Sequence, residues 1–154
     1  MDRLAAVLAS WFGSGYCPVA PGTAGSLAAA AAAYAAGQLW GWPPIVFLAL
    51  GAAFLLPGVW ASARMEECSG KADPQTVVVD EVVGQWIGLA GASSLEWKQV
   101  LAAFLLFRLF DIVKPFPAAR LEAAPGGWGV MLDDVMAGAY TALVMVLLGW
   151  FHVF

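Results

Sequence analysis

Acidic side chains form the most chemically suggestive pattern in this sequence, because they occur as adjacent pairs. Asp80 precedes Glu81, Asp133 precedes Asp134, and Asp111 lies between the two pairs. The only histidine is near the C-terminus, and neither cysteine belongs to a CxxC or zinc-binding pattern. Carboxylates without His or Cys are hard oxygen ligands, which suit Mg²⁺ better than zinc. We therefore expect Asp80, Glu81, Asp133 and Asp134 to hold Mg²⁺, with Asp80 and Asp134 as the first choices.

A second group of charged residues interrupts an apolar run. Arg108 and Asp111 are three residues apart, so a helix places them on one face, where they are expected to pair. Charged side chains in apolar surroundings are costly and mark functional sites by default. Arg108 and Lys114 can bind phosphoryl oxygens. We therefore assign Arg108, Asp111 and Lys114 to catalysis together with the two acidic pairs. Ordinary helix caps and a solvated loop are the alternative, but they do not explain the spacing of Arg108 and Asp111.

A glycine-rich segment, residues 13–27, is predicted to form a loop that opens a helix near Leu27. Free backbone N–H groups and the positive end of the helix dipole would favour a bound phosphate there. The segment lacks the GK[ST] ending of a P-loop, so nucleotide binding is not implied. A plain connector with Ser26 as N-cap is an equally good interpretation of the loop itself. The residues that we assign to substrate binding are Ser14, Gly22, Thr23, Gly25, Ser26 and Arg120.

The composition points to a membrane protein. Hydrophobic residues make up 62% of the 154 residues, whereas a soluble domain is usually nearer half apolar. Eight tryptophans suit the interfacial belts of a bilayer. A net charge of −4 and the lack of a basic patch give no indication of nucleic-acid binding. The length suits one domain, residues 1–154. A compact soluble helical domain with a very apolar core is the rival interpretation.

Period-two alternation is nearly absent, which favours an all-α fold with about four to five apolar helices. The acidic pairs are expected to cap the helices that follow them. Gly84 and Gly88 have the spacing that lets helices pack closely, and Pro57 is expected to kink a helix. Helices are predicted over residues 3–12, 27–42, 45–63, 82–91, 98–112 and 135–153, with a polar loop over 64–75 and a flexible turn over 126–129.

Lysine and arginine mark the cytoplasmic side of a membrane, so they allow the predicted helices to be threaded. With Arg3 inside, successive crossings leave Arg64 and Lys114 inside as well, and Lys98 is the exception on the outer side. Under this threading the glycine-rich segment and both acidic pairs gather at the cytoplasmic face. The sequence therefore predicts one charged face on an otherwise apolar helical protein.

Four segments together resemble the phosphatidylglycerophosphatase A family, namely GSGYCPVAPGTAGSL, VVDEVVGQW, FRLFDIVKPFP and GGWGVMLDDVMAG. The resemblance implies a Mg²⁺-dependent membrane phosphatase that hydrolyses phosphatidylglycerol phosphate to phosphatidylglycerol and phosphate. It also implies a helical protein of the bacterial inner membrane with its site at the cytoplasmic leaflet. Cys17 stands where the family commonly has Ser, which argues against a nucleophilic role for it. Arg120 is displaced by one residue from the arginine of the family pattern.

A non-enzymatic membrane subunit or a small transporter is the competing class of protein. Charged residues would then form a permeation path and be spread through the depth of the membrane, whereas the threading places them at one face. For an enzyme, attack by water is favoured over a covalent aspartyl-phosphate, because no carboxylate lies in a known nucleophile motif.

Overall fold

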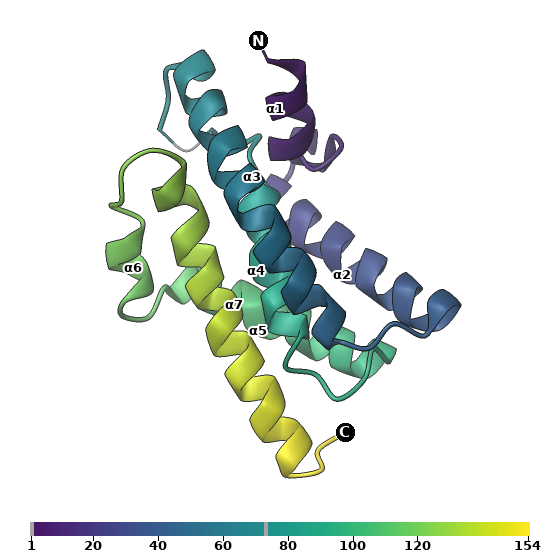
Figure 1. The fold of residues 1–154 in the computed structure, drawn as a ribbon. Helices are drawn as coiled ribbons and strands as arrows, with labels where there is room; N and C mark the ends of the chain where they lie inside the picture. Colours follow the sequence, from purple (N-terminus) through teal and green to yellow (C-terminus); the bar gives the residue numbers. More distant parts are fainter. Residues whose placement is uncertain (1, 73) are drawn as a thin grey trace.

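The computed structural model describes residues 2–72 and 74–154, and all of their regular structure is helical (Figure 1). Seven α-helices and one 3₁₀ turn follow one another, and no strand occurs in these residues. The prediction of an all-α fold is confirmed. The elements are α1 (Arg3–Ala9), the 3₁₀ turn η1 (Ser14–Tyr16), α2 (Pro21–Trp40), α3 (Ile45–Ser69), α4 (Val79–Leu89), α5 (Trp97–Val113), α6 (Ala118–Leu121) and α7 (Gly127–Trp150).

The central helix of the fold is α4, although it has only 11 residues. Nine of these are buried, and α4 packs against α2, α3, α5 and α7. Val82, Trp86 and Leu89 belong to an apolar cluster shared with α2 and α5, while Val79 and Val83 belong to another shared with α1 and α3. Burial on both sides fixes the rotation of α4 about its axis. It therefore also fixes the direction in which the acidic residues of its first turn point.

Glycines allow α4 and α7 to pack very closely. A side chain at Gly84 would meet the backbone oxygen of Asp134, and one at Gly138 would meet the backbone of Gly84. Further along, a side chain at Gly88 would meet Thr141. Residue numbers therefore rise together along both helices, so the helices run parallel and their acidic pairs lie at the same end. The close packing predicted from the spacing of Gly84 and Gly88 is confirmed.

The first long helix begins earlier than predicted. α2 starts at Pro21 and not near Leu27, because proline is well suited to the first position of a helix, where its missing N–H is not needed. The glycines that follow are not loop residues. A side chain at Gly25 would collide with the side chain of Val78. Glycine here therefore permits close contact between α2 and the residues before α4.

The last helix also begins earlier than predicted. α7 starts at Gly127 and not at Val135, and Gly126 occupies its N-cap position. The predicted turn over 126–129 is helical from Gly127 onward. Glycine is needed at this position because a side chain there would collide with the backbone of α3. Asp133 and Asp134 consequently lie well inside α7. The prediction that one of them caps this helix is wrong.

Two helices are long and apolar enough to cross a membrane by length and composition. They are α3 and α7, and no other helix in the described residues meets this description. The predicted count of four to five apolar helices is not confirmed. α3 runs through Pro57 to Ser69 and ends at Gly70, which has the left-handed conformation common at helix ends. The predicted loop over 64–75 therefore begins later than expected, because its first residues extend α3.

Candidate active site

Five helices contribute to one polar pocket of about 510 Å³. The pocket lies where α2, α4 and α7 begin and where α3 and α5 end. Charged side chains therefore gather at one end of the helix bundle, which is not the distribution that a permeation path requires. All the residues that were predicted to be catalytic line this pocket, namely Asp80, Glu81, Arg108, Asp111, Lys114, Asp133 and Asp134.

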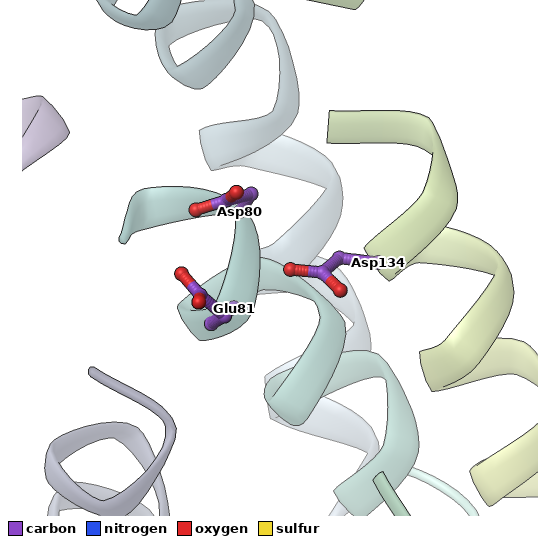
Figure 2. Close-up of side chains that lie close together, drawn as sticks. All are labelled: Asp80, Glu81 and Asp134. Carbon is purple, nitrogen blue, oxygen red and sulfur yellow. The ribbon is translucent and has the colours of Figure 1, made fainter. Parts of the chain in front are cut away.

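Asp80, Glu81 and Asp134 form an acidic group inside the pocket (Figure 2). One carboxylate oxygen from each of the three residues lies within 4.8 Å of the others. Asp80 and Glu81 come from the first turn of α4, and Figure 2 shows the Asp134 carboxylate directed from α7 toward α4. Val78, and not Asp80, is the N-cap residue of α4, and its side chain makes no capping hydrogen bond. The prediction that the acidic pair Asp80 and Glu81 supplies the N-cap of this helix is therefore wrong.

Two members of the acidic group, Glu81 and Asp134, each have a buried oxygen without a hydrogen-bond partner. Asp134 is only 3% exposed, and within the described residues it forms no ion pair. Oδ1 of Asp134 and Oε2 of Glu81 are buried and accept no hydrogen bond. Burial raises the pKa of Glu81, and the hydrogen bond with Asp80 and the attraction of Arg108 offset this only in part. Carboxylates this close repel each other when ionised, and oxygen ligands in this arrangement fit a divalent cation.

Lys114 draws Asp133 away from the acidic group. Its Nζ donates hydrogen bonds to Oδ2 of Asp133 at 2.8 Å and to Oε2 of Glu122 at 3.0 Å. Burial alone would lower the pKa of Lys114, but these hydrogen bonds outweigh it and raise the pKa above its ordinary value. Asp133 was predicted to be a metal ligand, and the structure leaves it outside the group of three. Glu122 also lines the pocket, although the sequence did not single it out as a site residue. Its position in the charged stretch after Lys114 was the only signal for such a role.

Arg108 is held in one orientation by its neighbours. Its Nη1 lies 2.9 Å from Oδ2 of Asp111 and 4.0 Å from Oε1 of Glu81, and it donates a hydrogen bond of 3.2 Å to Oγ of Ser26. The predicted pairing of Arg108 with Asp111 is confirmed. The Ser26 hydroxyl donates its own hydrogen to the backbone oxygen of Gly22 at 2.9 Å. Ser26 is fully buried and has no hydrogen left for a ligand, so it supports Arg108.

The first turn of α2 forms one side of the pocket. Ala20, Pro21, Gly22 and Thr23 all line it, and the N–H groups of Gly22 and Thr23 have no partner within the helix because of their position at its start. A side chain at Gly22 would collide with the Glu81 carboxylate. The positive end of α2 therefore lies beside the acidic group. The segment expected to bind phosphate does face the pocket, although its helix begins earlier than predicted.

Four residues that were predicted to bind substrate do not line the pocket, namely Ser26, which contacts Arg108, and Ser14, Gly25 and Arg120. The Ser14 hydroxyl donates to the backbone oxygens of Ser10 and Trp11, and Ser14 is not a lining residue of the pocket. Gly25 is buried and packs against Val78, the residue before α4. The Arg120 guanidinium lies 4.8 Å from the ring of Phe116, and Arg120 is not a lining residue either. Periodicity could not have revealed these positions, because they depend on how separate helices meet.

Fold and site together define a class of protein. The chain is a helical protein whose pocket combines a carboxylate group for a divalent cation, an oriented arginine and the positive end of a helix, as phosphate chemistry requires. The profile of the family described as Phosphatidylglycerophosphatase A matches residues 7–149, and the chain belongs to this family. It is a phosphatase that acts on phosphoric monoesters.

Three relatives align with nearly the whole chain. A Bacteroides thetaiotaomicron protein provisionally named phosphatidylinositol-3-phosphatase is 42% identical, and the match covers 96% of this chain and 94% of that protein. Phosphatidylglycerophosphatase A of Haemophilus influenzae is 41% identical over 90% of this chain and 85% of its own length. Phosphatidylglycerophosphatase A of Escherichia coli is 36% identical over 93% and 82%. No solved structure matches the chain.

Proposed function

We propose that this protein hydrolyses phosphatidylglycerol phosphate to phosphatidylglycerol and inorganic phosphate, as a step of phospholipid biosynthesis. The observation that carries the proposal is the single pocket in which Asp80, Glu81 and Asp134 lie beside Arg108 and the start of α2. The family description and the names of the Haemophilus influenzae and Escherichia coli relatives support this choice of substrate.

The cofactor that we propose is Mg²⁺, held by Asp80, Glu81 and Asp134. The support is the partnerless buried oxygens of Glu81 and Asp134 and a purely carboxylate set of ligands, which suits a hard divalent cation. When bound, the cation would neutralise charge on the phosphate oxygens and act as a Lewis acid. Asp133 is not needed as a ligand, because it is engaged by Lys114.

The protein's own groups bind and orient the phosphate in this proposal. Arg108 faces the pocket from one side and would bind phosphate oxygens through the guanidinium nitrogen that Ser26 and Asp111 leave free. The N–H groups of Gly22 and Thr23 would bind another oxygen at the positive end of α2. Lys114 would add positive charge to the pocket while Asp133 holds its ammonium group in place. Water is the nucleophile that we favour.

We place the protein in the bacterial inner membrane, with the pocket on the cytoplasmic side. Two candidate membrane spans, α3 and α7, support the membrane location. The pocket lies at the C-terminal end of α3 and at the N-terminal end of α7, so both spans would leave the membrane on the same side there. Arg64, near the end of α3, favours the cytoplasm for that side.

A second candidate substrate is a phosphatidylinositol phosphate. The favouring observation is the name of the Bacteroides thetaiotaomicron relative, which is as similar to this chain as the other two. Both candidates present a phosphate monoester on a lipid headgroup, so the acidic group and Arg108 would treat the reacting phosphate alike. The two differ in the bulk of the headgroup, which would have to fit the same 510 Å³ pocket.

The test is phosphate release by the purified protein in detergent micelles that contain either lipid. We expect faster release from phosphatidylglycerol phosphate, loss of release with EDTA, and recovery on addition of Mg²⁺. Faster release from phosphatidylinositol 3-phosphate would select the second candidate. Release that is insensitive to EDTA would refute the proposed cofactor, and no release from either lipid would favour a non-enzymatic membrane subunit.

A further inference from the structure

An apolar groove of about 200 Å³ lies between α2 and α5. Its walls are apolar and aromatic side chains, with Leu27, Ala31 and Tyr34 from α2 and Trp97, Leu101 and Phe104 from α5. The rims are open, since Leu27 is 55% exposed and Leu101 is 47% exposed. Nothing in the proposed phosphatase reaction uses this groove.

The groove begins next to the polar pocket. α2 and α5 run antiparallel, because Arg108 bonds to Ser26 at one end and Gln38 donates to the backbone oxygen of Leu95 at the other. One helical turn therefore separates the pocket residue Thr23 from Leu27 of the groove, and one turn separates Arg108 from Phe104. Along α2, the groove continues for seven residues, or about 10 Å.

We propose that this groove binds an acyl chain of the lipid substrate while the headgroup phosphate occupies the polar pocket. The inference rests on the proposed function, because it requires the substrate to be a phosphorylated lipid. A lipid phosphate joins a charged group to apolar chains in one molecule, and the structure places a charged pocket and an apolar groove end to end. Other exposed apolar side chains on α5, such as Leu105 and Leu109, line neither cavity.

The volume of the groove favours a single chain over a partner helix. An α-helix is about 10 Å across with its side chains, so over the same length it would need several times the space available. A polymethylene chain is slender and has no polar groups to satisfy, which suits walls that offer no hydrogen-bonding partner along most of their length. The groove therefore selects for lipids with chains long enough to reach it.

The test compares two forms of phosphatidylglycerol phosphate, one with palmitoyl chains and one with butanoyl chains that are too short to fill the groove. Ala31→Phe would place a ring in the groove from α2, and Leu101→Trp would do so from α5. Ala32→Phe is the matched control, because Ala32 is exposed on the same helix but does not line the groove. All four proteins are assayed for kcat and KM in the same micelles.

We expect kcat/KM for the palmitoyl lipid to fall at least about tenfold in Ala31→Phe and Leu101→Trp, mainly through KM, since tenfold corresponds to lost burial of about two methylene groups. Activity on the butanoyl lipid should stay at the wild-type level, and Ala32→Phe should match the wild type on both. Unchanged activity on the palmitoyl lipid in both groove variants overturns the proposal, as does an equal loss on both lipids. Failure of the wild type on both lipids would instead refute the proposed function.

Discussion

At the scale of single residues, both basic side chains of the pocket already have acidic partners, whereas Asp134 forms no ion pair among the described residues. Arg108 is paired with Asp111 and Lys114 with Asp133, so neither is free to neutralise Asp134. Glu81 has Arg108 at 4.0 Å, which is a weaker contact than the 2.9 Å pairing with Asp111. The positive charges of Arg108 and Lys114 thus lie beside the acidic group, and neither forms an ion pair with Asp134. A divalent cation would supply what the side chains leave missing.

Replacing Asp134 by Asn tests the metal assignment. The variant keeps the size of the side chain but removes one of three acids that lie within 4.8 Å. We expect the Mg²⁺ concentration for half-maximal activity to rise at least about tenfold. In EDTA, we expect a higher melting temperature than that of the wild type, because repulsion between buried carboxylates is relieved. Glu67→Gln, an exposed acid outside the pocket, should change neither quantity. Wild-type Mg²⁺ dependence in Asp134→Asn would contradict the assignment.

Replacing Ser26 by Ala tests whether this residue acts through Arg108. The variant removes the hydroxyl that accepts from Arg108, and a hydrogen bond to a charged group is worth about 1.5–3 kcal/mol, so kcat/KM should fall about tenfold or more. In an Arg108→Lys background the same change should have little further effect, because the partner is already lost. Ser14→Ala should retain full activity, since Ser14 lies outside the pocket. Additive effects of the two changes would argue for an independent role of Ser26.

At the scale of helices, the site depends on where each helix begins and on how closely it can approach its neighbours. Five helix ends meet at the pocket, and glycines set the separation between them. Gly22 admits Glu81, Gly84 and Gly138 bring α4 to α7, and Gly127 brings α7 to α3. These contacts place Asp80 and Glu81 of α4 opposite Asp134 of α7.

The sequence predicts the helices and most of the charged pocket residues but not the helix starts. The spacing of Arg108 and Asp111 and the two acidic pairs are local patterns, and the structure brings them into one pocket. The glycines near Gly25 and Gly127 look like loop residues because isolated glycine disfavours a helix. Their helical conformation is compensated by contacts with Val78 and with α3, which no local pattern contains. The sequence also could not predict that Asp133 lies outside the acidic group, because this depends on the ion pair between Lys114 at the end of α5 and Asp133 in α7.

Replacing Gly138 by Ala tests this dependence on close packing. The new methyl group would collide with the backbone oxygen of Gly84, so α4 and α7 must move apart. We expect destabilisation by about 1–3 kcal/mol, seen as a lower melting temperature in detergent. We also expect a higher Mg²⁺ concentration for half-maximal activity, because the acidic residues of α4 and α7 would lie farther apart. Gly149→Ala is the control on the same helix, since its methyl group would meet only Ser93 at 3.9 Å. It should be neutral or slightly stabilising through helix propensity, and equal behaviour of both variants would contradict the packing argument.

At the scale of the whole molecule, the pocket lies at one end of two antiparallel candidate spans. A side chain at Gly58 would meet Met131, and one at Gly127 would meet Val59 and Ala63, so the start of α7 packs against the C-terminal half of α3 and the two helices run antiparallel. With 25 and 24 residues, each helix is about 36–38 Å long, which exceeds the roughly 30 Å of a hydrocarbon core. Both helices can therefore cross a bilayer while their pocket ends reach one aqueous side. Figure 1 shows that α6 lies near the start of α7, whereas the C-terminus lies at the other end of α7.

Cysteine labelling tests this orientation. Cys68 is exposed near the end of α3, at the pocket end, and His152→Cys would place a thiol just beyond α7 at the other end. Cys17 is replaced by Ser in both proteins, and Cys68 is also replaced by Ser in the His152→Cys protein. A membrane-impermeant thiol reagent should label Cys68 in inverted inner-membrane vesicles but not in intact spheroplasts. The cysteine at 152 should show the reverse pattern, because a helix that crosses once exposes its two ends to different compartments.

Labelling of both positions from the same side would show that α7 does not cross the membrane. Labelling of Cys68 from the spheroplast exterior would place the pocket on the wrong side for a lipid phosphate of the cytoplasmic leaflet.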